Sequence, residues 1–66
     1  MKKDSDNSPK IMTVPEVARY LHLHATTVYK LLKNKDIPAF KLGSDWRFEK
    51  TEIDRWVNEL AKRGQH

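Results

Sequence analysis

The sequence between residues 13 and 33 reads TVPEVARYLHLHATTVYKLLK. It contains two patterns in which apolar residues recur at i, i+3 and i+4, the spacing of a single stripe along a helix. The apolar residues are Val14, Val17, Ala18 and Leu21 in the first pattern, and Val28, Leu31 and Leu32 in the second. We therefore expect helices over residues 14–21 and 25–33. The three residues between them make a unit of the size of a helix-turn-helix.

The ends of these two helices are marked by specific residues. Thr13 and Glu16 have the spacing of a capping box, and Pro15 falls in the first turn, where no amide donor is missed. The segment at residues 34–36 ends the second helix, and Pro38 prevents it from resuming. The folded part of the chain is thus expected to begin near Ile11.

Between residues 39 and 48 the apolar period changes to two, which indicates a β-hairpin. The alternating apolar residues are Phe40, Leu42, Trp46 and Phe48, and a turn at residues 43–45 interrupts them. One apolar side is kept only if Phe40 faces Phe48, Lys41 faces Arg47 and Leu42 faces Trp46 across a three-residue loop. The sequence therefore predicts this register, with the apolar side turned to the core.

In that register the like charges of Lys41 and Arg47 face each other, which costs a few tenths of a kcal/mol and up to about 1 kcal/mol. A negatively charged partner would explain such a pair. The alternative is that both side chains extend into water near Asp45 or Glu49. On this pairing, removing Arg47 is expected to leave the free domain as stable as before, or slightly more stable.

A third helix is expected after Glu49 and Lys50. Its apolar residues again fall at i, i+3, i+4 and i+7, and they are Ile53, Trp56, Val57 and Leu60. Acidic residues in its first turn and Lys62 and Arg63 before Gly64 suit the helix dipole. We expect one domain over residues 11–63, preceded by a disordered polar tail at residues 1–10.

The composition restricts the class of protein. Sixty-six residues with net charge +4 make one small basic domain, and the basic excess lies in residues 11–48. Cysteine is absent, and neither a membrane-spanning run nor an apolar signal-peptide segment is visible. Two glycines cannot build a phosphate loop, and no nucleophile and base pair stands out. We therefore expect a soluble cytoplasmic protein that is not an enzyme and needs no cofactor.

Four segments, at residues 12–21, 27–32, 37–43 and 46–48, closely resemble the excisionase-type DNA-binding family, which is related to the MerR winged helix. The resemblance covers about residues 11–60. It implies a mostly α fold with a small β-hairpin, a winged helix-turn-helix in which the helix at residues 25–33 lies in the major groove of DNA. The chain departs from the family at the turn, where His22 stands in place of a common glycine.

The resemblance also implies which residues contact double-stranded DNA. On the recognition helix and at its start these are His24, Ala25, Thr26, Thr27, Tyr29, Lys30 and Lys33. On the wing they are Lys41, Ser44 and Arg47. A helical wheel independently places Thr26, Tyr29, Lys30 and Lys33 away from the apolar stripe, although a lysine-rich helix face is often only solvated.

The function expected from these features is sequence-specific binding to double-stranded DNA. The resemblance implies an architectural role in site-specific recombination, with a recombinase or further copies of the chain as partners and, in a bacterium, a place in the nucleoid. A transcriptional regulator with the same domain is the close alternative. Neither a membrane nor a small-molecule substrate is expected as a partner.

Three other interpretations fit the sequence less well. A protein-interaction module would expose an apolar patch, whereas here one core is expected to take up nearly all apolar residues. An RNA-binding sheet would carry aromatic and basic side chains on one strand face, and the predicted register separates them. His22 and His24 lack further ligands at metal-site spacing, so no metal is expected, and capping the second helix or contacting a phosphate is the expected role.

Overall fold

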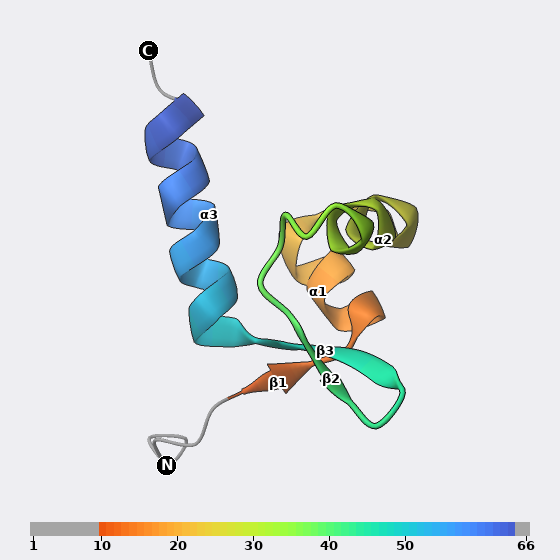
Figure 1. Ribbon diagram of the computed structural model, residues 1–66. Coiled ribbons are helices and arrows are strands. Elements are labelled where there is room, and N and C mark those ends of the chain that lie inside the picture. The colour runs from red at the N-terminus through yellow and green to blue at the C-terminus, as the bar shows by residue number, and fades with distance from the viewer. Residues whose placement is uncertain (1–9, 65–66) are drawn as a thin grey trace.

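The computed structural model describes residues 10–64 (Figure 1). The elements follow the order β1 (Ile11–Met12), α1 (Val14–Leu21), α2 (Ala25–Lys33), β2 (Phe40–Leu42), β3 (Asp45–Glu49) and α3 (Lys50–Gly64). This is the expected mostly helical architecture of a winged helix-turn-helix. Apart from Lys10, the expected tail lies outside the described residues.

The capping box at the start of α1 forms as the sequence predicts. The Thr13 amide donates to Glu16 Oε1 at 2.8 Å, and the Glu16 amide donates to Thr13 Oγ1 at 3.4 Å. The first of these bonds lowers the pKa of the Glu16 carboxyl below its ordinary value of 4.5. At the other end of α1, His22 takes a left-handed backbone conformation with φ 59°, and its amide donates to the Arg19 carbonyl at 3.2 Å. The histidine therefore adopts the left-handed conformation that glycine commonly supplies at the end of a helix.

The hairpin register differs from the predicted one by one residue. Phe40 pairs with Arg47, Lys41 with Trp46 and Leu42 with Asp45. The loop is the two residues Gly43 and Ser44, and Gly43 has φ 68°. A glycine with positive φ at the first loop position is typical of a tight type II′ hairpin turn, so Asp45 joins the strand. The predicted three-residue loop, and the facing of Lys41 and Arg47, are therefore wrong.

The sheet also has a third strand that the sequence analysis did not predict. The strand order is β1-β3-β2, with Ile11 opposite Glu49 and Met12 opposite Phe48. The Lys50 amide then donates to the Lys10 carbonyl at 2.9 Å, one step beyond the strand pair. The strand β1 thus attaches the start of the described chain to the base of α3.

The core lies where α1 and α2 meet the inner face of this sheet. Its buried side chains are Met12, Val14, Val17, Ala18, Val28, Leu32, Ile37, Phe48 and Ile53, and Trp46 and Trp56 pack against them. The register places Phe40 and Leu42 on the outer face instead, where they are 39% and 57% exposed. The expectation that both belong to the core is therefore wrong.

The helix α3 leaves the end of β3 and rises from the sheet on the same side as α1 and α2, which lie to its right in Figure 1. Ile53 in its first half is fully buried, but Val57 and Leu60 are about 40% exposed. The hydroxyl of Tyr20 on α1 donates to the Asp54 carboxylate, which also accepts from Lys50 Nζ at 3.0 Å. These contacts tie the base of α3 to α1. Within residues 10–64, none of the helices has the length and apolar character needed to cross a membrane.

Candidate nucleic-acid interface

The site begins with the outward face of α2. Thr26, Tyr29, Lys30 and Lys33 are all exposed and follow one another at helical spacing. The opposite face of α2 buries Val28 and Leu32 in the core, so this exposed stripe is fixed in orientation. The helix carries two lysines and no acidic residue. Its outer face is therefore positively charged along its last turn.

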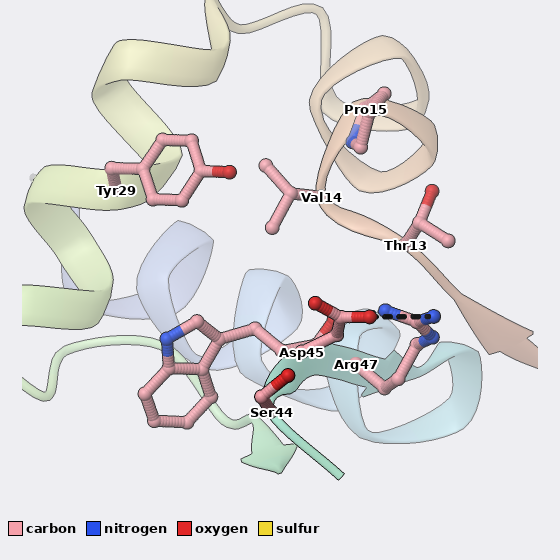
Figure 2. A pocket seen from close by; sticks show the side chains of 8 residues that line it. Thr13, Val14, Pro15, Tyr29, Ser44, Asp45 and Arg47 are labelled. Carbon is pink, nitrogen blue, oxygen red and sulfur yellow. Dashed lines mark hydrogen bonds and ion pairs between the residues drawn. The ribbon is translucent and has the colours of Figure 1, made fainter. Parts of the chain in front are cut away.

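Between α2 and the wing lies a groove of about 330 Å³ (Figure 2). Tyr29 lines it from α2, and its hydroxyl points into the groove toward Val14. The other walls come from the start of α1 and from the first half of the wing strand β3. The complete lining is Thr13, Val14, Pro15, Tyr29, Ser44, Asp45, Trp46 and Arg47.

Arg47 is held in place on the floor of this groove. Its Nη1 donates to the Trp46 carbonyl at 2.9 Å, and its Nη2 lies 3.7 Å from Asp45 Oδ2. The Arg47 side chain is 26% exposed, whereas that of Asp45 is 68% exposed. A guanidinium with two of its donors engaged keeps others that can bind a phosphate in the geometry that arginine favours. A phosphate that bound this guanidinium would compete with the Asp45 carboxylate.

Lys41 lies apart from Arg47, on the other face of the hairpin. Its Nζ lies 5.1 Å from the centroid of the Trp46 ring, the distance of a cation–π contact. Lys41 therefore covers part of the Trp46 ring and is itself an exposed residue. The like-charge argument for an anionic partner no longer holds, because the two side chains do not face each other.

The structure thus brings three of the expected contact residues, Tyr29, Ser44 and Arg47, into one groove. Thr26, Lys30 and Lys33 continue the same surface along α2. The α2 start places His24 and Ala25 at exposed positions, and Thr27 is half-buried. His24 is the N-cap residue of α2, but its side chain makes no capping hydrogen bond within the described part of the chain, so the expected capping role is not seen.

Two features of the groove were not predicted from the sequence. The N-terminus of α1 forms one of its walls, and the Asp45 carboxylate pairs with the arginine on its floor. The capping box at Thr13 signals where that helix begins, but only the tertiary fold places it beside β3. Across residues 10–64, no three His, Asp or Glu side chains are grouped closely enough to hold a metal ion.

The expected separation of aromatic and basic side chains on the wing is also wrong. Trp46 shares a face with Lys41, and Phe40 shares the other with Arg47. Exposed apolar side chains on β1, β2 and α3 likewise contradict the expectation that one core takes up nearly all of them. The sequence analysis used these two expectations to argue against an RNA-binding sheet and a protein-interaction module. Both arguments therefore no longer hold.

The model of a family described as a helix-turn-helix domain matches residues 11–61 of the chain. The match spans α1, α2, the wing and most of α3. Comparison with curated proteins and with solved structures gives no match.

Proposed function

Since the chain belongs to the helix-turn-helix domain family of the excisionase-like type, we propose that it is a sequence-specific binding protein for double-stranded DNA. Membership in this family indicates DNA binding, and it is typical of proteins that act by binding rather than by catalysis. In the proposed complex α2 lies in the major groove, where recognition helices read base edges. The wing lies along the neighbouring backbone.

The observation that supports this proposal most is the continuity of α2 with the wing through one groove. Tyr29 on α2 and Arg47 on β3 line the same groove, and Lys30 and Lys33 extend its basic surface. A guanidinium and lysines aimed at phosphates supply affinity without sequence information, whereas Thr26 near the start of α2 has the position from which base edges are read.

We further propose that the bound protein acts as an architectural factor in site-specific recombination, with copies on adjacent DNA sites. A single module of this kind buries only about 600–1,000 Å² of protein surface, so one copy discriminates poorly among sequences. Binding at repeated sites would supply the missing specificity. A transcriptional regulator would use the same binding mode. The two roles differ in the protein that acts on the bound DNA, which is a recombinase in the first and a polymerase in the second.

The test is a titration of duplex DNA with the protein at several salt concentrations. Replacing Lys30 and Lys33 by alanine is expected to weaken binding to every duplex and to lower the slope of log affinity against log salt by about 1.8, which is about 0.9 for each lost phosphate contact. The matched control replaces Arg55 and Lys62 on α3, which removes the same charge from the far side of the molecule. Equal losses in both double variants would contradict the proposed interface.

A further inference from the structure

The strand β1 forms one edge of the sheet, and its outer side is open. The strand order β1-β3-β2 places no strand of residues 10–64 beyond it. The Lys10 carbonyl accepts from the Lys50 amide, so the backbone groups of Lys10 point toward the β3 side. Because these groups alternate in direction along an antiparallel strand, the N–H and C=O of Ile11 point the other way. Ile11 therefore presents one donor and one acceptor to a further strand.

A groove of about 270 Å³ lies beside this open edge, with walls from β1 and α1. The lining of this β1 groove is Lys10, Ile11, Met12, Glu16, Arg19 and Tyr20. The Tyr20 side chain is held in place, because its hydroxyl donates to Asp54 and Lys50 Nζ lies 5.1 Å from the centroid of its ring. One wall of the groove is thus ordered before any partner binds, which lowers the entropy cost of binding.

The charges of the β1 groove favour an acidic partner. Lys10 and Arg19 are both exposed, and neither belongs to an ion pair formed among residues 10–64. The one acidic residue of the lining, Glu16, already accepts a hydrogen bond from the Thr13 amide at 2.8 Å. The lining therefore has a net positive charge. A carboxylate beside Lys10 or Arg19 would form a charge-assisted hydrogen bond.

The β1 groove is separate from the proposed DNA interface. It shares no lining residue with the groove that contains Tyr29 and Arg47. The three α1 residues of its lining are exposed, on the side of the helix opposite to the buried Val17 and Ala18. A partner in the β1 groove therefore does not compete with DNA bound along α2 and the wing.

We propose that the β1 groove binds an extended acidic segment of another protein, which adds to the sheet as a strand beside β1. In strand addition of this kind, backbone hydrogen bonds supply affinity and side-chain pockets supply specificity. Ile11 provides the two backbone hydrogen bonds, Tyr20 contacts an apolar side chain of the segment, and Lys10 and Arg19 pair with its carboxylates. The inference goes beyond DNA binding, because it gives the chain a separate site for a protein partner.

The experiment is a nuclear magnetic resonance titration of the labelled protein, without DNA, with a capped heptapeptide that alternates glutamate and leucine. The amide signals of Ile11, Arg19 and Tyr20 are expected to shift most, with a dissociation constant of about 0.1–1 mM, because the contact is small. The same peptide with lysine in place of glutamate is expected to bind about tenfold more weakly. Equal binding of both peptides, no saturable binding, or shifts largest on α2 would overturn the proposal.

Methylation of the peptide backbone tests the strand addition. In an extended peptide the N–H groups of the leucines point to one side and those of the glutamates to the other. A peptide methylated on its leucine nitrogens and one methylated on its glutamate nitrogens are therefore expected to differ, and only one of them should lose affinity, by about tenfold. Equal affinities of the two methylated peptides would contradict strand addition.

The matching change on the protein side is Ile11→Pro. It removes the N–H that points to the open edge, and proline is tolerated at such a position because the ladder to β3 does not use that donor. The affinity for the acidic peptide is expected to fall about tenfold, whereas Ile11→Val, the matched control, keeps it. Dispersed amide signals for β3 confirm that the sheet still forms. An Ile11→Pro protein with an intact sheet and unchanged affinity would overturn the proposal.

Charge reversal distinguishes the acidic segment from other occupants. Arg19→Glu is expected to weaken binding of the acidic peptide about fivefold. Lys62→Glu on α3, outside the lining, is the matched control for net charge and is expected to change it little. The two variants are expected to bind a mixed-sequence duplex equally. A larger loss of duplex affinity in Arg19→Glu would make the β1 groove part of the DNA interface and overturn the proposal.

Two further outcomes separate the inference from its rivals. Signals of Ile11 and Arg19 that move with protein concentration in the absence of peptide would make a second copy the occupant, and would overturn the proposal. If the acidic peptide binds as expected but no duplex is bound, the proposed function fails and the β1 groove stands.

Discussion

Lys41 lies directly across the hairpin from Trp46, with its Nζ 5.1 Å from the centroid of the indole ring. Trp46 in turn packs against the core and lines the groove beside Arg47. Lys41 and Arg47 therefore lie on opposite faces of the wing and have different surroundings. Lys41 covers the ring of Trp46, and Arg47 pairs with Asp45 at the groove.

Replacing Lys41 by alanine is expected to destabilise the free domain by about 0.5–1 kcal/mol, the value of an exposed cation–π contact. Lys41→Arg keeps a cation above the ring and is the matched control. Urea unfolding followed by circular dichroism measures both changes. If Lys41→Ala were as stable as Lys41→Arg, the contact with Trp46 would contribute nothing to the stability of the wing.

The two phenylalanines of the hairpin test its register. Phe48 is fully buried, so Phe48→Ala is expected to cost about 3–5 kcal/mol, which is roughly the whole stability of a domain of this size. Phe40→Ala, on the exposed face, is expected to cost much less. Thermal melting of the two variants checks this contrast. Similar losses in both would favour the three-residue loop, in which Phe40 and Phe48 share the buried side.

The contacts of Asp54 make the free energy of unfolding depend on pH in the acid range. The hydrogen bond from Tyr20, and then that from Lys50, lowers the pKa of the Asp54 carboxyl below its ordinary value of 3.8. A carboxyl with a lowered pKa stabilises the fold above its ordinary pKa, and this contribution is lost as the pH falls through the lower folded value. Because the Asp54 side chain is 46% exposed, solvent screening keeps the contribution below about 1 kcal/mol.

Asp54→Asn is therefore expected to be slightly less stable than wild type at pH 7 and equally stable near pH 2. Urea unfolding at both pH values measures the two differences. Glu16 has a lowered pKa in both proteins, so its own acid dependence cancels in the comparison. A stability difference that stays constant from pH 7 to pH 2 would show that the charge of the Asp54 carboxylate does not stabilise the fold.

Substitutions in the wing and in α2 are expected to change DNA binding in different ways. Arg47→Ala should weaken binding to all duplexes by a similar factor and lower the salt slope by about 0.9. Thr26→Ala should instead change which sequence is preferred. Selection of bound sites from random duplexes, together with salt titrations, measures both effects. Arg55→Ala is the control, because Arg55 pairs with Glu52 at 3.1 Å and is likewise an arginine beside an acidic neighbour.

Arg47→Ala is also expected to lower the stability of the free domain slightly, by about 1 kcal/mol, because it removes the ion pair with Asp45 and the hydrogen bond to the Trp46 carbonyl. The predicted register, in which Arg47 faces Lys41, implies the opposite change, a free domain that is as stable as before or slightly more stable. A loss well above 1 kcal/mol with unchanged DNA affinity would make Arg47 a structural residue.

The helices could be predicted from the sequence because their signals are local. The stripe of Val14, Val17 and Ala18, with the capping box before it, fixes both the position and the buried side of α1. The same reasoning placed Thr26 and Lys30 on the outward face of α2. These features depend only on residues within a turn or two of one another.

The hairpin and α3 show why the rest could not be predicted. A period of two fits two registers, and the choice between them depended on Gly43 forming a two-residue loop. The stripe of α3 fixes which side is apolar but not how far the sheet covers it, so the exposure of Leu60 could not be deduced. The two-residue strand β1 is too short to show any period.

The most direct test of the account is a nuclear magnetic resonance titration of the labelled protein with a duplex that has room for one copy. The amide signals of Thr26, Tyr29, Ser44 and Arg47 are predicted to shift most, because they belong to α2 and the wing on either side of the groove, while the signal of Leu60 stays near its starting position. Large shifts along α3 with an unchanged α2 and wing would contradict the proposed interface.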